Sequence, residues 1–106
     1  MILIANFRAP VAKYIIEWPS GMVDPGEHTW DAALRELKEE TGYTASKADI
    51  TNISPIYHND PWKSNENEVL ISISVDLEDP ENIEPHQELD SAENIKVLFI
   101  DASNLM

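Results

Sequence analysis

Short apolar runs alternate with polar breaks along the chain, and this pattern predicts a series of β-strands. The runs read MILIANF (1–7), KYIIEW (13–18), ITNISPIY (50–57), EVLISISVDL (68–77) and NIKVLFI (94–100), each bounded by Pro, Asn, Asp or Gly. In the fourth run, apolar residues at 69, 71, 73 and 75 alternate with Ser72 and Ser74. A period of two is typical of a strand with one buried face.

One stretch has the period of a helix instead. Its apolar side chains recur at i, i+3, i+4 and i+7, and they are Trp30, Ala33, Leu34 and Leu37. The stripe predicts a helix from about Trp30 to about Thr41 that packs on the sheet. We expect Thr29 to be its N-cap, Asp31 to lie in its first turn and Gly42 to end it.

The remaining segments are predicted to be loops. Residues 76–93, which carry two Pro and eight acids, are expected to form a long exposed loop. Trp18 ends a predicted strand and Trp30 starts the helical stripe, so both are expected to be packing residues. The three histidines lack the spacing of metal ligands, and we expect each of them to be non-catalytic.

Composition and length narrow the classes of protein that the chain can represent. The 106 residues are 42% hydrophobic, which suits a single globular domain over residues 1–106. The predicted strands and single helix favour the α+β class. A net charge of −13 argues against a nucleic-acid partner, and the sequence has no Cys for a disulfide or thiolate site. No apolar run is long enough to span a bilayer, and the start lacks the features of a signal peptide. We therefore expect no membrane partner and a cytoplasmic location, with the nucleus also open.

Three glutamates lie close together on the predicted helix. Glu36, Glu39 and Glu40 are three and four residues apart, so their side chains share one flank. They could form an ordinary solvated face, partly balanced by a pair between Arg35 and Glu39. A hard divalent cation would offset their repulsion more directly, because Mg²⁺ and Mn²⁺ prefer oxygen ligands.

The spacing around these glutamates resembles that of a known family. Gly21, five residues, Glu27, seven residues and then RELKEETGY (35–43) fill every specified position of the Nudix box, G-x5-E-x7-R-E-U-x-E-E-x-G-U, where U is apolar or aromatic. The flanking segments NFRAPVAKYIIEWPSGMVDPGE and SPIYHNDPWKSNENEVLISISVDLEDPENIEP are similar to those of eukaryotic ADP-ribose and ADP-sugar pyrophosphatases. The resemblance implies an α/β/α sandwich with a mixed sheet, and Mg²⁺-dependent hydrolysis of ADP-ribose or a related ADP-sugar to AMP and a sugar phosphate, with Mn²⁺ as a substitute for Mg²⁺.

The resemblance also implies roles for individual residues. The implied metal ligands are the Ser20 backbone carbonyl, Glu27, Glu36, Glu39 and Glu40. The implied catalytic residues are Glu93, Glu39 and Arg35, with Glu88 and Asp90 as competitors of Glu93 for the role of base. The implied substrate-binding residues are Arg8, Phe7, Gly21, Met22, Asp60 and Trp62.

Two of these assignments have alternatives. Arg8 could be a surface arginine at a strand end. Trp62 replaces the Gly of a usual Asp-Pro-Gly loop, and its ring could stack on a base, plug the pocket or pack elsewhere.

The chain departs from the family at both ends. It begins at the Nudix core without the N-terminal dimerising region, and it lacks the C-terminal helix that covers the sheet. We therefore expect one sheet face to be uncovered and the chain to self-associate, and a family-type homodimer is in doubt. Two other functions stay open: hydrolysis of another nucleoside diphosphate derivative, such as an oxidised one, and a truncated module that binds nucleotide or protein without turnover.

Overall fold

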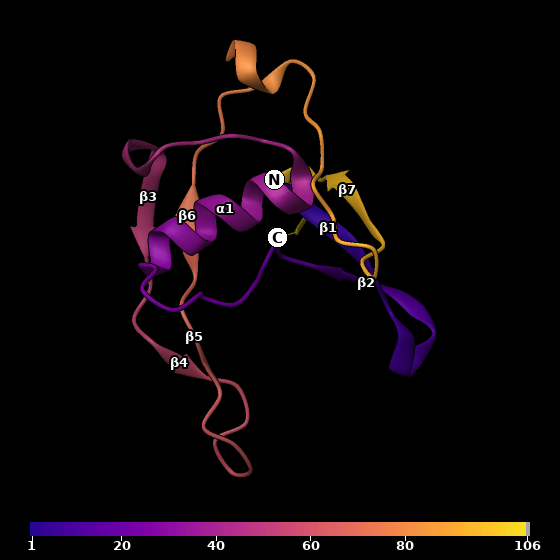
Figure 1. Cartoon of the computed structure of the whole chain (residues 1–106), viewed down its shortest axis with the longest axis vertical. Helices are drawn as coiled ribbons and strands as arrows, with labels where there is room; N and C mark the ends of the chain where they lie inside the picture. Colours follow the sequence, from indigo (N-terminus) through magenta and orange to yellow (C-terminus); the bar gives the residue numbers. More distant parts are fainter. Residues whose placement is uncertain (106) are drawn as a thin grey trace.

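The structure is a computed structural model and describes residues 1–105, which form one α-helix and seven short strands (Figure 1). The elements are β1 (Ile2–Arg8), β2 (Lys13–Glu17), α1 (Thr29–Thr41), β3 (Ile50–Ile53), β4 (Tyr57–His58), β5 (Asn67–Glu68), β6 (Ile71–Ile73) and β7 (Ile95–Phe99). Short 3-10 helices span Ala9–Val11, Lys47–Asp49, Pro80–Asn82 and Ala102–Leu105. This arrangement confirms the predicted α+β class with a single helix.

The described strands pair only in antiparallel fashion, in three separate sheets. The first has the order β2-β1-β7, and the others are the pairs β3-β6 and β4-β5. The described strands thus form three small antiparallel sheets in place of the mixed sheet that the resemblance implied. The β4–β5 hairpin projects away from α1 and from the three-stranded sheet (Figure 1).

Strand β1 lies at the centre of the three-stranded sheet and sends alternate side chains to its two faces. Ile4 is opposite Glu17 on β2 and Val97 on β7, so these three side chains share a face. Ile4 is fully buried, and Ile95 of β7 is 4% exposed. The core therefore lies on this inner face, where Tyr43 packs edge-on against Phe99 at 5.9 Å between ring centroids.

The other face of this sheet is uncovered along β2 and at the end of β1, although Leu3 on the same face is buried. We call Phe7, Tyr14 and Ile16 the outer face; they are 40%, 42% and 61% exposed, and the rings of Phe7 and Tyr14 meet edge to face at 5.5 Å. The expectation of an uncovered sheet face is thus met. Trp18 is 52% exposed, so its prediction as a packing residue is wrong, because β2 already ends at Glu17.

Helix α1 confirms the predicted span to within one residue. It begins at Thr29 with His28 as the N-cap, so the prediction of Thr29 as N-cap is wrong. The ring of Trp30 stacks on that of His28 at 4.4 Å, which fixes the helix start by packing rather than by a side-chain cap. At the other end Gly42 has φ 81°, and its N–H donates to the carbonyl of Lys38.

Two predicted long strands are each broken in two. Residues 50–57 divide into β3 and β4, and residues 68–77 give β5 and β6. The N–H of Ser54 still donates to the Leu70 carbonyl. Pro55 follows it and has no N–H to donate, so the pairing ends there. The predicted alternation from 69 to 75 nevertheless holds, since its apolar residues are half-buried and its two serines are exposed.

Residues 76–93 form a largely exposed loop, as expected, with one buried anchor. Asn82 is 4% exposed; its amide donates to the carbonyls of Thr44 (3.0 Å) and Asp76 (2.8 Å), and its side-chain oxygen accepts from the N–H of Thr44.

Within residues 1–105, no helix has the length and apolar character needed to cross a membrane.

Candidate functional site

Arg35 fastens the loop before α1 to the helix. Its guanidinium donates to both carboxylate oxygens of Glu27 at 2.9 and 3.1 Å, and to the backbone carbonyl of Met22 at 2.9 Å. The hydrogen bonds from Arg35 and from the backbone N–H of Asp24 lower the pKa of Glu27. The loop that precedes the helix is therefore held by charge-assisted bonds between residues that the sequence had already singled out.

The same guanidinium reaches two further carboxylates of the helix. Nη1 of Arg35 lies 2.8 Å from Glu36 and 3.2 Å from Glu39. The predicted pair of Arg35 with Glu39 is thus present, and it belongs to a larger network.

Glu40 is a buried carboxyl group beside this network. Its side chain is only 4% exposed, and Oε2 accepts a hydrogen bond from the Ser20 N–H at 3.0 Å. Burial raises the pKa of Glu40 to about 7, with further contributions from the charges of Glu36, Glu93 and Glu17. Three neighbouring carboxylates thus add to the negative charge around Glu40.

Glu36 completes the cluster and needs a glycine opposite it. Burial raises the pKa of Glu36 despite its bond to Arg35, and the charges of Glu39 and Glu93 add to the rise. A Cβ on Gly21 would overlap the carboxyl carbon and Oε1 of Glu36. Only a residue without a side chain allows the loop to approach this carboxylate so closely.

The carboxylates of these residues are suitable ligands for a hard divalent cation, but their side chains do not converge on one point. In the described part of the chain, no three side chains of Asp, Glu or His converge as a group that could hold an ion. Arg35 instead carries the positive charge that Glu27, Glu36 and Glu39 share. Mg²⁺ or Mn²⁺ would offset the repulsion between Glu36 and Glu40, and both ions prefer oxygen ligands such as these carboxylates. The five-residue ligand set stays a prediction.

Arg8 lies at the edge of this cluster and is paired with a residue that the sequence analysis missed. Its Nε and Nη2 donate to the two carboxylate oxygens of Glu17 at 2.9 and 2.6 Å. That hydrogen bond is the main cause of the raised pKa of Arg8, and the charge of Glu40 also contributes. Glu17 gave no signal in the sequence, because its approach to Arg8 depends on the register of the β1–β2 hairpin.

Of the late-loop acids, Glu93 interacts with the charges of Glu36 and Glu40. Its charge raises the pKa of both Glu36 and Glu40, whereas Glu88 and Asp90 are not among the causes. The Glu93 carboxylate accepts from the N–H of Asp90 at 3.1 Å, so a tight local turn orients it.

Three predicted substrate-binding residues lie away from the cluster. Phe7 points to the outer face, on the side of β1 opposite Arg8. Asp60 and Trp62 lie on the projecting loop between β4 and β5, where Trp62 is 81% exposed and Lys63 Nζ lies 5.5 Å from its ring centroid. Such exposure contradicts the alternatives in which Trp62 plugs a pocket or packs elsewhere, and stacking on a base stays a prediction.

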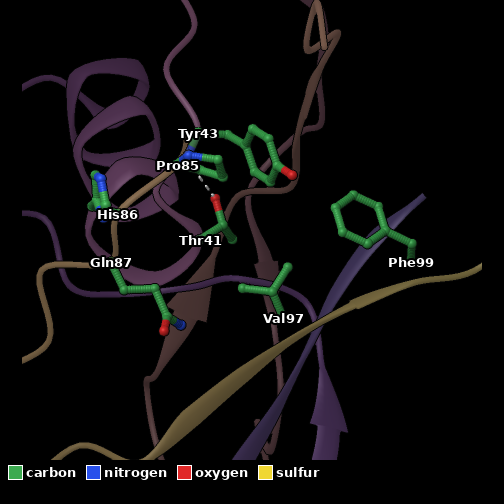
Figure 2. A pocket seen from close by; sticks show the side chains of 7 residues that line it. All are labelled: Thr41, Tyr43, Pro85, His86, Gln87, Val97 and Phe99. Atoms are coloured by element: carbon green, nitrogen blue, oxygen red, sulfur yellow. Dashed lines mark hydrogen bonds between the residues drawn. The ribbon is translucent and has the colours of Figure 1, made fainter. Parts of the chain in front are cut away.

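An open cavity of about 530 Å³ lies at the C-terminal end of α1. Its lining residues are Thr41, Tyr43, Pro85, His86, Gln87, Val97 and Phe99 (Figure 2). The carboxylate cluster contributes none of them, so the cavity is a separate feature of the fold. Gln87 was not predicted to matter, because it is a lone Gln in an acidic loop and matches no motif.

Comparisons with known proteins agree with this geometry. The family model of the NUDIX domain matches residues 2–103. Putative nudix hydrolase 2 of Caenorhabditis elegans is 41% identical over 106 residues, which are 100% of this chain and 47% of that protein. ADP-ribose pyrophosphatase of Saccharomyces cerevisiae is 42% identical over 101 residues, covering 95% of this chain and 42% of that protein.

A mammalian relative extends the same picture. ADP-sugar pyrophosphatase of Mus musculus is 33% identical over 106 residues, which are 100% of this chain and 47% of that protein. The chain thus spans about half the length of the curated relatives it matches.

Proposed function

Because the chain belongs to the Nudix family, we propose that it hydrolyses the pyrophosphate bond of ADP-ribose or a related ADP-sugar, in a reaction that requires Mg²⁺ or Mn²⁺. The observation that carries the proposal is the buried Glu40, which accepts a hydrogen bond from the Ser20 N–H and whose pKa is raised by burial and by the charges of Glu36 and Glu93. The names of the yeast and mouse relatives, ADP-ribose pyrophosphatase and ADP-sugar pyrophosphatase, support the choice of substrate.

The residues present would hold the cation through carboxylate oxygens. Glu36 and Glu40 are the main ligands in this proposal, with Glu39, Glu27 and the Ser20 carbonyl as further ones. A bound divalent cation neutralises a pyrophosphate and lowers the pKa of water. Arg35 keeps Glu27, Glu36 and Glu39 in place from the side.

Glu93 is the proposed general base. Attack of water on one phosphorus forms a new P–O bond and breaks the bond to the bridging oxygen, while Glu93 accepts the proton of the water. The products are AMP and a sugar phosphate. Arg8 is proposed to bind a substrate phosphate, for which its guanidinium would exchange Glu17 for the phosphate oxygens.

Other parts of the proposal concern the whole chain. We propose that residues 1–106 form one Nudix domain, that it works in the cytoplasm and that its partner is a small nucleoside diphosphate sugar. The negative charge of the chain supports a role without nucleic acid.

The first test is AMP release from ADP-ribose with and without Mg²⁺, for the natural chain, Glu40→Gln and Gly21→Ala. Glu40→Gln keeps the acceptor for the Ser20 N–H but removes the charge, and we expect a loss of at least about 100-fold in kcat. Gly21→Ala retains every carboxylate and displaces that of Glu36, so we expect a loss of about tenfold or more.

Thr51→Val serves as the control, since the Thr51 hydroxyl donates to the Ser72 carbonyl between β3 and β6, away from the cluster. It should retain normal AMP release. A folded chain that binds Mn²⁺ but releases no AMP would reject hydrolysis of this substrate and favour a non-catalytic binding module. Turnover of another nucleoside diphosphate, such as an oxidised one, would reject only the ADP-sugar assignment.

A further inference from the structure

The last turn of α1 receives two hydrogen bonds from a loop far away in the sequence. A helix leaves its final carbonyls without intrahelical donors, and these must be satisfied by other groups. Here the Gly42 N–H donates to Lys38 O at 2.8 Å, and the Glu88 N–H donates to Glu39 O at 2.8 Å. The Gln87 side chain donates to Glu40 O at 2.6 Å. Two of the three bonds therefore come from the loop that also carries Glu93.

Gln87 also bonds to the strand that follows this loop. Its Nε2 lies 3.1 Å from the carbonyl of Ile95, the first residue of β7, in addition to its bond with Glu40 O. One amide group thus joins the helix turn that carries Glu40 to the start of β7. Figure 2 shows Gln87 extending from the loop below Thr41 toward Val97.

The loop is fixed on both sides of Glu93. On one side are the bonds from Gln87 and Glu88 to the helix end, and on the other the Asn94 carbonyl accepts from the Phe7 N–H at 3.0 Å. The span between these anchors is short, so the loop has little freedom to move relative to α1.

We propose that Gln87 is a positioning residue that sets the distance between the Glu93 loop and the Glu40 turn of α1. This inference rests on the proposed function, and it adds a residue that touches neither the reacting atoms nor the carboxylates. Gln87 is itself part of the loop, and its side chain donates a hydrogen bond to the backbone carbonyl of Glu40. Without it the two sides of the site can shift against each other.

The test is Gln87→Met, which keeps the length of the side chain and removes both donors. Gln87 is exposed, so the variant should fold. We expect calorimetric affinity for Mn²⁺ alone to fall about three- to tenfold, and kcat for ADP-ribose at saturating Mg²⁺ to fall about tenfold. KM for ADP-ribose should stay within about twofold, because Gln87 does not contact the substrate.

Asn82→Asp is the matched control. Asn82 lies in the same loop as Gln87 and also uses one amide group to bridge two backbone carbonyls, those of Thr44 and Asp76. It should lower the melting temperature and leave the Mn²⁺ affinity and kcat of the folded protein unchanged. If this buried site does not tolerate Asp, Thr51→Val takes its place as the control. Equal losses of Mn²⁺ affinity in Gln87→Met and in the control would overturn the positioning role.

The wild-type measurements separate this inference from the proposed function. If the natural chain binds Mn²⁺ and releases AMP while Gln87→Met does both equally well, the positioning role alone is wrong. If the natural chain neither binds Mn²⁺ nor releases AMP, the proposed function fails and the positioning role fails with it. Weakened Mn²⁺ binding and lower kcat in Gln87→Met alone would support both.

Discussion

At the scale of single residues, the site places acids where they repel one another and then offsets only part of that repulsion. Arg35 is shared among Glu27, Glu36 and Glu39. Within residues 1–105, the Glu40 carboxylate accepts one hydrogen bond, from the Ser20 N–H. An unneutralised buried carboxylate is costly, and it can respond by taking up a proton. Proton uptake and cation binding are therefore alternative ways for Glu40 to lose its excess charge.

This competition predicts a pH dependence of stability in the metal-free chain. The folded-state pKa of Glu40, about 7, lies above its ordinary value of 4.5, so the folded chain holds more protons between these pH values. The contribution of Glu40 to the free energy of unfolding should fall, on the order of 1–3 kcal/mol, as pH rises through this window. Urea unfolding of the natural chain and of Glu40→Gln measures this change in the free energy of unfolding, at pH values from 5 to 8 spaced by about one pH unit.

Glu40→Gln should lack this part of the pH dependence, and saturating Mn²⁺ should remove it from the natural chain. Parallel curves for the two proteins would mean that Glu40 is ionised throughout. The raised pKa would then play no part in stability.

At the scale of elements, the sequence predicted α1 better than the strands around it. Its apolar period, the acid in its first turn and the glycine at its end are local features, and the helix follows from them. The strands at 50–57 and 68–77 were predicted too long, because their pairing depends on a partner distant in sequence. The Nudix spacing singled out Arg35 and the acids that it contacts in the structure. Glu17 and Gln87 make their contacts through strand register and loop closure, which no motif encodes.

The end of α1 gives a prediction at this scale. Gly42 has φ 81°, and a Cβ there would lie 2.5 Å from the backbone nitrogen of His86, in the segment that leads to Gln87. Gly42→Ala should therefore cost more than the usual strain of a left-handed residue, about 2–4 kcal/mol in the free energy of unfolding. Thermal unfolding of the variant measures this loss.

Gly26→Ala is the control for backbone strain alone. Gly26 has φ 80°, but a Cβ there meets nothing within 4 Å. Its cost should be about 1 kcal/mol. Similar losses in the two variants would show that the close approach of residues 85–86 to the helix end adds nothing to the strain.

At the scale of the whole molecule, the three-stranded sheet is incompletely covered. Its inner face packs against α1 and the loop at 85–87, although Phe99 on that face is 59% exposed. On the outer face Phe7, Tyr14 and Ile16 remain exposed. Contiguous apolar surface of this kind favours association in water. The high negative charge of the chain opposes association over longer distances, so the balance depends on salt.

We therefore expect residues 1–106 alone to self-associate at raised salt, with a light-scattering mass above that of one chain. Ile16→Lys should reduce the mass toward the monomer value, because it places a charge in the outer face. Ile83→Lys is the matched control: Ile83 is 66% exposed, close to the 61% of Ile16, and lies in the long acidic loop. A monomeric mass for the natural chain at high salt would contradict the expectation, as would an equal effect of both variants.

The pairing of the first strand with the last sets when the site can assemble during synthesis. Strand β1 lies between β2 and β7, and the Met1 amino group donates to the Ile100 carbonyl, 99 residues away. Until residues 95–99 leave the ribosome, β1 has only its hairpin partner, and Gln87 lacks its second acceptor, the Ile95 carbonyl. Contacts of such long range form slowly, so we expect β1 to stay incompletely paired and exposed to chaperones until residues 95–99 have left the ribosome.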